Sequence, residues 1–247
     1  MKLIQLTCVF MSLVAQAQNT EKLLYDHFNP IHLKEFETTV FYSQVDILNS
    51  EFGLHKSKIA SIFKLQNRTF QFAYHQYGYQ HFKESKYSLS SAQELTSKMN
   101  LGLNINVHFL SITELEKLHS ISFDIGYSYK SDTYEIRLFL ENPLNNRYIE
   151  NDLESRFIVS SRYYWNSNLF SELQLEESIH SGFKASHQLE YTYKDFLSLS
   201  ILQSIHPLEY GFRLGYKKER FQFYSQYRKL TWTNSTGFAL IYQLTND

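Results

Sequence analysis

Residues 119–141 alternate between apolar and polar side chains with a period of two. From residue 120 to residue 129, even-numbered positions hold serine, aspartate or glycine, and odd-numbered positions hold isoleucine, phenylalanine or tyrosine. A polar turn follows at residues 130–133. Beyond it, apolar residues at even-numbered positions alternate mostly with Glu and Arg. Such alternation on both sides of a short turn predicts a β-hairpin.

This hairpin has one face with full charges and another that ends in tyrosines beside the turn. A membrane-spanning β-barrel needs this distribution, because its outer face meets lipid, its lumen is polar, and aromatic rings lie at the headgroup level. In this interpretation Phe123, Ile125, Leu138 and Phe212 face lipid, whereas Asp124 faces the lumen.

The alternation continues along the chain and predicts fourteen strands. They are expected at residues 34–43, 57–65, 69–77, 86–95, 101–110, 119–129, 134–141, 156–165, 169–178, 182–193, 197–205, 208–217, 221–228 and 236–244. Short turns alternate with longer connections, notably at residues 44–55, 78–85 and 142–155. Because short turns face the periplasm in such barrels, both termini are expected there. Twelve and sixteen strands are the alternatives.

A soluble β-sandwich is the competing fold, since its strands also alternate. The unbroken run of strands and the alternation of short and long connections favour a barrel. So does a row of amphipathic rings near the short turns, where a membrane–water boundary would lie: Tyr129, Tyr134, Tyr163, Trp165, Tyr193, Tyr216 and Tyr242. We therefore predict an all-β fold, a transmembrane antiparallel up-and-down β-barrel of about fourteen strands.

The N-terminus has the pattern of a secretory signal peptide at residues 1–17. Lys2 precedes an apolar run, and Ala15-Gln16-Ala17 fits a small-x-small cleavage site. Cleavage would leave a mature chain that begins near Gln18. We expect a periplasmic segment at residues 18–33 and a barrel at residues 34–247.

Composition excludes several classes of partner and chemistry. The net charge of -1 offers no basic stripe for nucleic acid. The single cysteine, Cys8, lies within the signal pattern, so the mature chain would have neither disulfides nor thiolate ligands. The mean hydropathy of -0.38 is low for a membrane protein, but alternate residues of a barrel strand must be polar. An export signal with alternating aromatic strands indicates a Gram-negative outer membrane, with its lipid as the surrounding partner.

Charged side chains recur on the predicted inward face. Glu135, Arg137, Arg162 and Glu172 lie on nearby strands in this register and are expected to pair. With Asp124 and Arg213 they make up the predicted lumen charge network. Buried charges need partners, so we favour a salt-bridged lumen filling over a lining that selects solutes.

The sequence shows no catalytic or metal-binding pattern of the familiar types. His75 and His108 face the lumen in this register, but no His-x-Ser pair lies on a strand beside an acidic or amide group that could orient the histidine. Metal-ligand spacings of the His-x-x-x-His or EF-hand type are also missing. We expect a protein that is not an enzyme and has no metal or cofactor.

Short motifs through most of the mature chain occur in an order typical of a known family. They are Asn29-Pro30, Phe82-Lys83-Glu84 followed by Tyr87-Ser88-Leu89-Ser90 and Ala92, Leu101-Gly102-Leu103-Asn104, Asp124-Ile125-Gly126-Tyr127, Glu141-Asn142-Pro143-Leu144, His206-Pro207-Leu208-Glu209-Tyr210-Gly211-Phe212 and Gly215-Tyr216-Lys217. They resemble the PorV/PorQ branch of the FadL-type (OMPP1) outer-membrane barrels of Bacteroidota. The chain departs from the family in its short length and in Ile31, where a small residue usually follows Asn-Pro.

The resemblance implies a fourteen-stranded barrel and one of two functions. The first is a type IX secretion accessory or surface cargo-binding barrel, whose partners are secreted proteins or the translocon. Its contact surface would be the loops at residues 44–55, 78–85 and 142–155, because loops on a rigid sheet carry function. The second is a FadL-like uptake channel for hydrophobic small molecules, with its working parts in the lumen and in any gap of the wall near Gly78. The short N-terminal segment argues against a large plug.

Overall fold

The computed structural model describes residue 30 and residues 39–49, 53–65, 68–113, 117–148, 151–153, 155–179, 182–194, 196–230 and 234–244. The expected signal peptide, most of the expected N-terminal segment and residues 34–38 of the expected first strand lie outside the described residues. Pro30 of that segment is buried. No helix in the described ranges is long and apolar enough to span a membrane.

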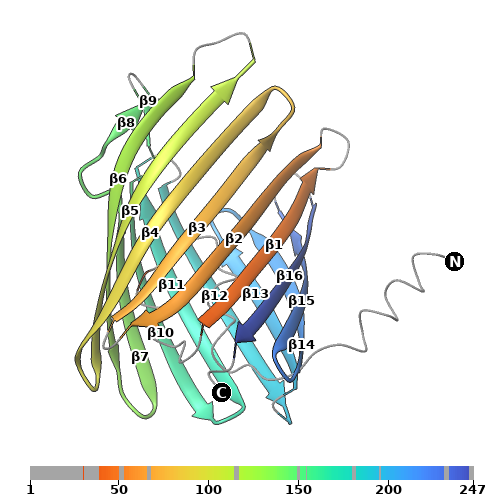
Figure 1. The fold of residues 1–247 in the computed structure, drawn as a ribbon. Helices are drawn as coiled ribbons and strands as arrows, with labels where there is room; N and C mark the ends of the chain where they lie inside the picture. The colour runs from red at the N-terminus through yellow and green to blue at the C-terminus, as the bar shows by residue number, and fades with distance from the viewer. Residues whose placement is uncertain are drawn as a thin grey trace, which may run out of the picture.

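Fourteen antiparallel strands close into one barrel (Figure 1), which confirms the predicted fold and strand number. Consecutive strands are hydrogen-bonded neighbours, except that β7 pairs with β10, and β1 closes the barrel against β16. The barrel strands are β1 (Thr39–Asn49), β2 (Leu54–Leu65), β3 (Arg68–Tyr79), β4 (Phe82–Thr96), β5 (Met99–Ile112), β6 (Leu118–Lys130), β7 (Tyr134–Glu141), β10 (Arg156–Asn166), β11 (Leu169–Ser178), β12 (Gly182–Tyr193), β13 (Leu197–Ile205), β14 (Glu209–Lys218), β15 (Phe221–Lys229) and β16 (Asn234–Leu244). Between β7 and β10, the short strands β8 (Arg147–Tyr148) and β9 (Asn151–Asp152) form a separate two-stranded sheet.

Apolar side chains cover the outside of the barrel, and polar side chains fill much of the inside. Phe123, Ile125, Leu138 and Phe212 all lie on the outer face and are 37% to 49% exposed, whereas Asp124 is 1% exposed in the lumen. A soluble β-sandwich would bury its apolar face and expose its polar one. This distribution is that of a barrel that crosses a membrane.

The tyrosine and tryptophan row lies on the outer face beside the short turns. Its rings contact one another: between ring centroids, Tyr129 of β6 lies 6.0 Å from Tyr134 of β7, and Tyr163 lies 5.0 Å from Trp165 on the same strand, β10. The Phe196 ring lies between two members of the row and contacts both Tyr193 and Tyr216 of β14. The rings therefore form one edge of the apolar band.

Two connections that were expected to be long are instead formed by strands. β1 continues to Asn49 and β2 begins at Leu54, so the expected loop at residues 44–55 was wrong. The physical reason is that the alternation does not stop at residue 43. Gln44 and Asp46 are buried in the lumen, while Val45 and Ile47 are exposed on the outside.

The expected irregular stretch at residues 78–85 is also wrong. β3 runs to Tyr79 and β4 begins at Phe82, with pairing that continues through Gly78, which lies opposite His55 and Lys83. Gly78 has a φ of 138°, a conformation that favours glycine. A Cβ there would lie 2.1 Å from the Phe82 carbonyl oxygen. Glycine thus lets the two strands approach, and the wall has no gap at this point.

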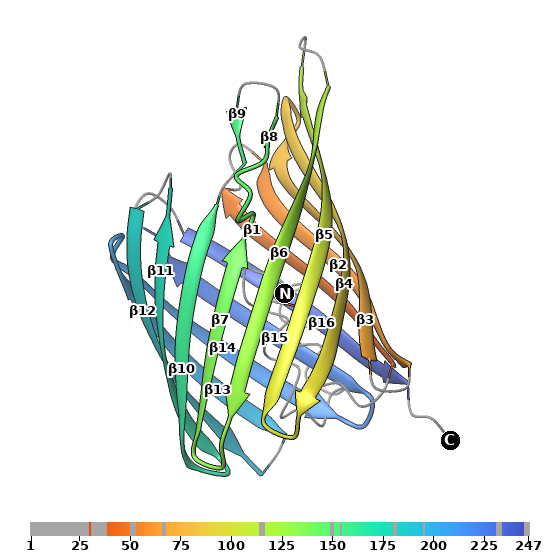
Figure 2. The same cartoon turned by 90° about the vertical axis from the view of Figure 1, so that its left-hand side faces the viewer.

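The barrel has an uneven rim at the end opposite the short turns. β4, β5 and β6 have 15, 14 and 13 residues, whereas β7 has 8 and ends at Glu141. Figure 2 shows β4 to β6 rising above β10 to β12, with β8 and β9 between the two levels. The connection between the barrel strands β7 and β10, residues 142–155, is longer than the other connections between barrel strands, as predicted.

Candidate binding vestibule in the barrel lumen

A cavity of about 640 Å³ occupies the loop end of the lumen. Inward-facing residues near that end of many strands form its wall, from Leu48 and Lys56 beside the β1–β2 turn to Arg156 of β10 on the opposite side. We call this cavity the vestibule. Its size is in the range of small-molecule binding sites.

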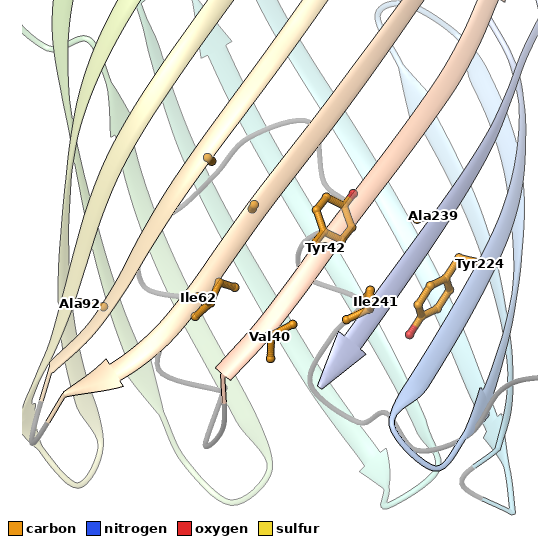
Figure 3. Packing of buried hydrophobic residues seen from close by; sticks show 9 residues of the cluster. Val40, Tyr42, Ile62, Ala92, Tyr224, Ala239 and Ile241 are labelled. Carbon is orange, nitrogen blue, oxygen red and sulfur yellow. The ribbon is translucent and has the colours of Figure 1, made fainter. Parts of the chain in front are cut away.

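The lumen below the vestibule contains an apolar cluster on one wall (Figure 3). Strands β1 to β4 and β15 to β16 contribute its members, which are Val40, Tyr42, Ala60, Ile62, Ala73, Ala92, Tyr224, Ala239 and Ile241, and none is more than 8% exposed. A polar lumen was expected throughout, so this cluster corrects the prediction. On β1 the outward positions are the odd-numbered ones, such as Phe41 and Val45, so Val40 and Tyr42 face inward.

An ion-pair layer occupies the facing wall. Arg137 binds both carboxylate oxygens of Glu135, at 2.6 Å and 2.8 Å, and donates to Glu172 at 3.1 Å. Arg162 reaches the other oxygen of Glu172 at 2.7 Å. The Tyr164 hydroxyl donates to Glu135 at 3.0 Å. The structure thus brings together the four residues expected to pair, and each is 5% exposed or less.

The other two members of the predicted charge network lie elsewhere. Asp124 accepts hydrogen bonds from the side-chain amides of Asn104 and Asn106, and from the backbone N–H of Asn142. Arg213 lines the vestibule on β14. Both side chains face the lumen, as expected, and a charge network that joins all six residues stays a prediction. Period-two alternation identifies the lumen face, but it does not give the height of a residue along a tilted strand.

Two further ion-pair groups line the vestibule itself. Glu141 accepts from Lys86 at 3.1 Å and from Arg156 at 2.7 Å, and Arg156 also lies 3.5 Å from Glu176. On another wall, Lys184 donates to Glu209 at 2.9 Å. These groups make the vestibule lining strongly charged, unlike the apolar lining of most drug-sized pockets.

The described residues of the β7–β10 connection fold inward against the tall wall of the barrel, and we call residues 142–148 and 151–153 the strap. It begins at Asn142, whose φ is 47° and whose side chain bonds the backbone oxygens of Asn146 and Leu153. Tyr148 and Leu153 then pack on Leu110. The strap therefore covers the β4–β6 side of the vestibule.

Tyr148 is the central contact of the strap with the barrel. Its hydroxyl donates to Glu84 at 3.3 Å, and its ring meets His108 edge-on with centroids 6.4 Å apart. Burial raises the pKa of the Tyr148 hydroxyl, and the nearby Glu84 carboxylate raises it further. Both effects disfavour the phenolate, so Tyr148 remains a neutral donor at ordinary pH.

A serine–histidine contact lies in the vestibule wall, where sequence spacing gave no sign of one. His108 Nε2 lies 2.8 Å from the Ser122 hydroxyl on the neighbouring strand. The other ring nitrogen of His108 is buried without a hydrogen-bond partner, so no carboxylate or amide orients the ring as in a catalytic triad. Asn106 also donates to Ser122. The arrangement is that of a polar ladder between β5 and β6.

Sequence patterns did not identify the strap contacts or the grouping of vestibule residues. The vestibule brings together strands that are distant along the chain, such as β12 with Lys184 and β15 with Arg228. The strap contacts likewise join residues that are far apart in the sequence, such as Tyr148 and Leu110. A pattern search could have found Asn142, because Asn tolerates the left-handed backbone conformation at the end of a strand. Within the described ranges, no three His, Asp or Glu side chains are placed to hold a metal ion.

Solved structures of outer-membrane channels are similar to this barrel. A deletion mutant of TodX, a monoaromatic hydrocarbon channel, has a TM-score of 0.72 and 9% identity, covering 93% of this chain and 95% of that chain. The shared fold is that of outer-membrane β-barrels. A Pseudomonas aeruginosa FadL homologue has a TM-score of 0.68 and 7% identity, covering 88% of this chain and 93% of its own. TodX itself, a Pseudomonas putida toluene transporter, has a TM-score of 0.66 and 8% identity, covering 89% and 94%.

At these identities the likeness is one of fold. No protein-family model and no curated protein matches the sequence. The finer resemblance to the PorV/PorQ branch stays a prediction.

Proposed function

We propose that the protein is an outer-membrane uptake barrel that admits a small solute into the vestibule. The observation that carries the proposal is the 640 Å³ cavity enclosed by the strand wall at the loop end. A closed barrel with an apolar exterior belongs in a lipid bilayer, and the similar TodX and FadL-homologue barrels come from outer membranes. The expected cleaved signal and a Bacteroidota origin belong to the same proposal.

The lining changes the class of solute that was expected. TodX is described as a hydrocarbon channel, and a FadL-like function was expected to concern hydrophobic molecules. The vestibule here is instead lined by Lys, Arg, Glu, Gln and Ser among a few leucines. Leaving buried charges opposite an apolar solute would cost free energy, so we propose a polar or charged solute.

Passage beyond the vestibule requires a rearrangement of the lumen. Gln71, Glu190 and Gln222 face inward below it, and each is 1% exposed. Side chains that bordered an open water-filled pore would be exposed. We therefore propose a gated barrel, in which the solute binds first and the filled layer moves afterwards.

The secretion-accessory function is the second hypothesis, and it has no observation of this structure in its favour. Two of its three expected contact loops are strands, and the described part of the third folds against the inner wall. Its test is a pull-down from native outer membrane with the intact protein and with residues 145–152 replaced by a Gly-Ser loop. Recovery of a secreted protein or translocon component with the intact strap alone would favour it.

Solute uptake by proteoliposomes tests the channel proposal. The purified protein should admit small polar solutes faster than empty liposomes do. Ser186→Trp, which fills the vestibule wall, should slow uptake, whereas Ser161→Trp, on the exposed outer face of β10, should not. Uptake equal to that of empty liposomes would contradict a channel, and equal uptake by both variants would exclude the vestibule as its route.

A further inference from the structure

Arg228 lies where three adjoining hollows of the lumen meet. It lines the vestibule, a side pocket of about 230 Å³ and a small recess against β14. Lys56 and Lys184 line the vestibule and the side pocket with it. Arg213 lines the vestibule and the recess. Four cations from four strands thus surround one region, which we call the basic quartet.

Positive charge exceeds negative charge in this region. The side pocket and recess are lined by the four cations of the quartet and by two carboxylates, Asp46 and Glu209. The formal balance of these lining groups is therefore 4 − 2 = +2, and it stays positive, at 4 − 3 = +1, when the buried Glu190 behind Gln188 and Ser200 is included. Glu209 accepts from Lys184, and Asp46 accepts side-chain amide N–H groups from Gln44 and Gln226. Walls of low dielectric focus such a field on the cavity between them.

Neutral polar groups and leucines complete the lining. Gln188 and Ser200 border the recess beside Arg213 and both donate to the buried carboxylate of Glu190, and Ser235 borders the side pocket. Leu48 and Leu230 line both the vestibule and the side pocket. The region thus offers cationic donors for a negatively charged head and a limited apolar surface for a small body.

We propose that the basic quartet is a binding subsite for a compact organic anion with carboxylate or similar oxygens. This proposal rests on the uptake function above and names the class of its solute. Arginine presents a planar fork of donors that matches two carboxylate oxygens, and lysine adds a point charge. A neutral molecule of equal shape would gain neither interaction, so charge determines what the vestibule retains.

Calorimetric titration of the detergent-solubilised full chain with benzoate and with benzamide tests the proposal. The two probes have nearly the same shape and differ in charge. Benzoate should bind at least about tenfold more tightly, because hydrogen bonds between two charged groups are stronger than those to a neutral amide. Its affinity should fall as salt rises from about 0.05 M to about 0.5 M, since screening weakens the attraction. Equal binding of both probes would overturn the proposal.

Substitutions locate the site. Arg228→Gln should weaken benzoate binding about tenfold, whereas Arg228→Lys should retain most of it. Lys218→Gln removes the same charge from the exposed short-turn end of β14 and should change nothing. Heat-modifiable migration of each variant on a gel verifies that the barrel is folded. Equal loss from Arg228→Gln and Lys218→Gln would overturn the assigned site.

The two proposals fail separately. If proteoliposomes take up benzamide and benzoate equally, and neither depends on Arg228, uptake stands and the anion subsite is wrong. If benzoate binds at Arg228 but no solute crosses the proteoliposome membrane, the subsite stands and the channel is wrong.

Discussion

At the scale of single residues, Gly237 makes room for a buried carboxylate. A Cβ at this lumen-facing position would lie 1.8 Å from Asp46 Oδ1 and 2.8 Å from Gln226 Nε2, two atoms that are hydrogen-bonded to each other at 2.6 Å. We predict that Gly237→Ala lowers the free energy of unfolding by about 1–3 kcal/mol through overpacking. Thr236→Ala, on the outward face of the same strand, should cost under about 0.5 kcal/mol. Urea titration in lipid measures both, and equal values would contradict the close approach.

The second residue-scale prediction concerns the ion-pair layer. Arg137→Met leaves Glu135 and Glu172 buried without their shared cation, which should lower the free energy of unfolding by about 3–5 kcal/mol. Adding Glu135→Gln to Arg137→Met should recover part of the loss, because the carboxylate that lost its bidentate partner is then neutral while Glu172 keeps Arg162 as its cation. The same urea titration compares the single and double variants. A double variant less stable than the single one would show that the Glu135 carboxylate is not the source of the loss.

At the scale of strands, alternation in the sequence predicted most of the barrel correctly. The hairpin of β6 and β7 begins and ends within about one residue of its expected bounds. The errors fall where polar inward-facing residues continue a strand between apolar outward ones, as at Gln44 and Asp46 of β1. Those side chains face the lumen, so their polarity signals inward orientation and not a loop.

The register of β6 can be tested with buried charge. Phe123→Arg places a cation on the lipid face and should cost about 2–4 kcal/mol if that position is near the bilayer midplane. Ser122→Arg is a poor control, because Ser122 is 1% exposed and bonded to Asn106 and His108. Gln174→Arg, on the vestibule wall, should cost much less. Equal losses in urea titrations would contradict the inside–outside assignment.

The strap is the other element whose behaviour follows from its contacts. Tyr148→Ala removes the ring that packs on Leu110, so the thiol of a Leu110→Cys background should react faster with a water-soluble reagent. Tyr148→Phe should keep the ring packed on Leu110, so in the same background the thiol should react more slowly than it does in the alanine variant. Because the pKa of Tyr148 is raised, its hydrogen bond to Glu84 persists at every pH below the ordinary tyrosine pKa of about 10. That hydrogen bond weakens only as the pH rises through the raised value. Unchanged thiol reactivity in the alanine variant would contradict a covering strap.

At the scale of the whole molecule, the lumen has an open half and a filled half, and sequence patterns did not predict this division. Alternation assigned Val40 and Ile62 to strands, but the apolar cluster exists only because six strands from the two ends of the chain close against each other. Likewise, Arg137 and Glu172 are 35 residues apart and meet because β7 pairs with β10, skipping β8 and β9. Strand order in space, more than strand identity, determines what the lumen can hold.

Thiol labelling in intact cells tests this division most directly, because the only cysteine, Cys8, lies in the expected signal peptide. Each engineered cysteine is then the sole thiol of the mature chain. Gln174→Cys and Ser186→Cys line the vestibule at half-buried positions and should react with a membrane-impermeant thiol reagent added outside the cells. Gln71→Cys and Gln222→Cys, at positions 1% exposed below it, should stay unreactive in the folded barrel. Rapid labelling at residues 71 and 222, or none at residues 174 and 186, would contradict a lumen that is open at the loop end and filled below.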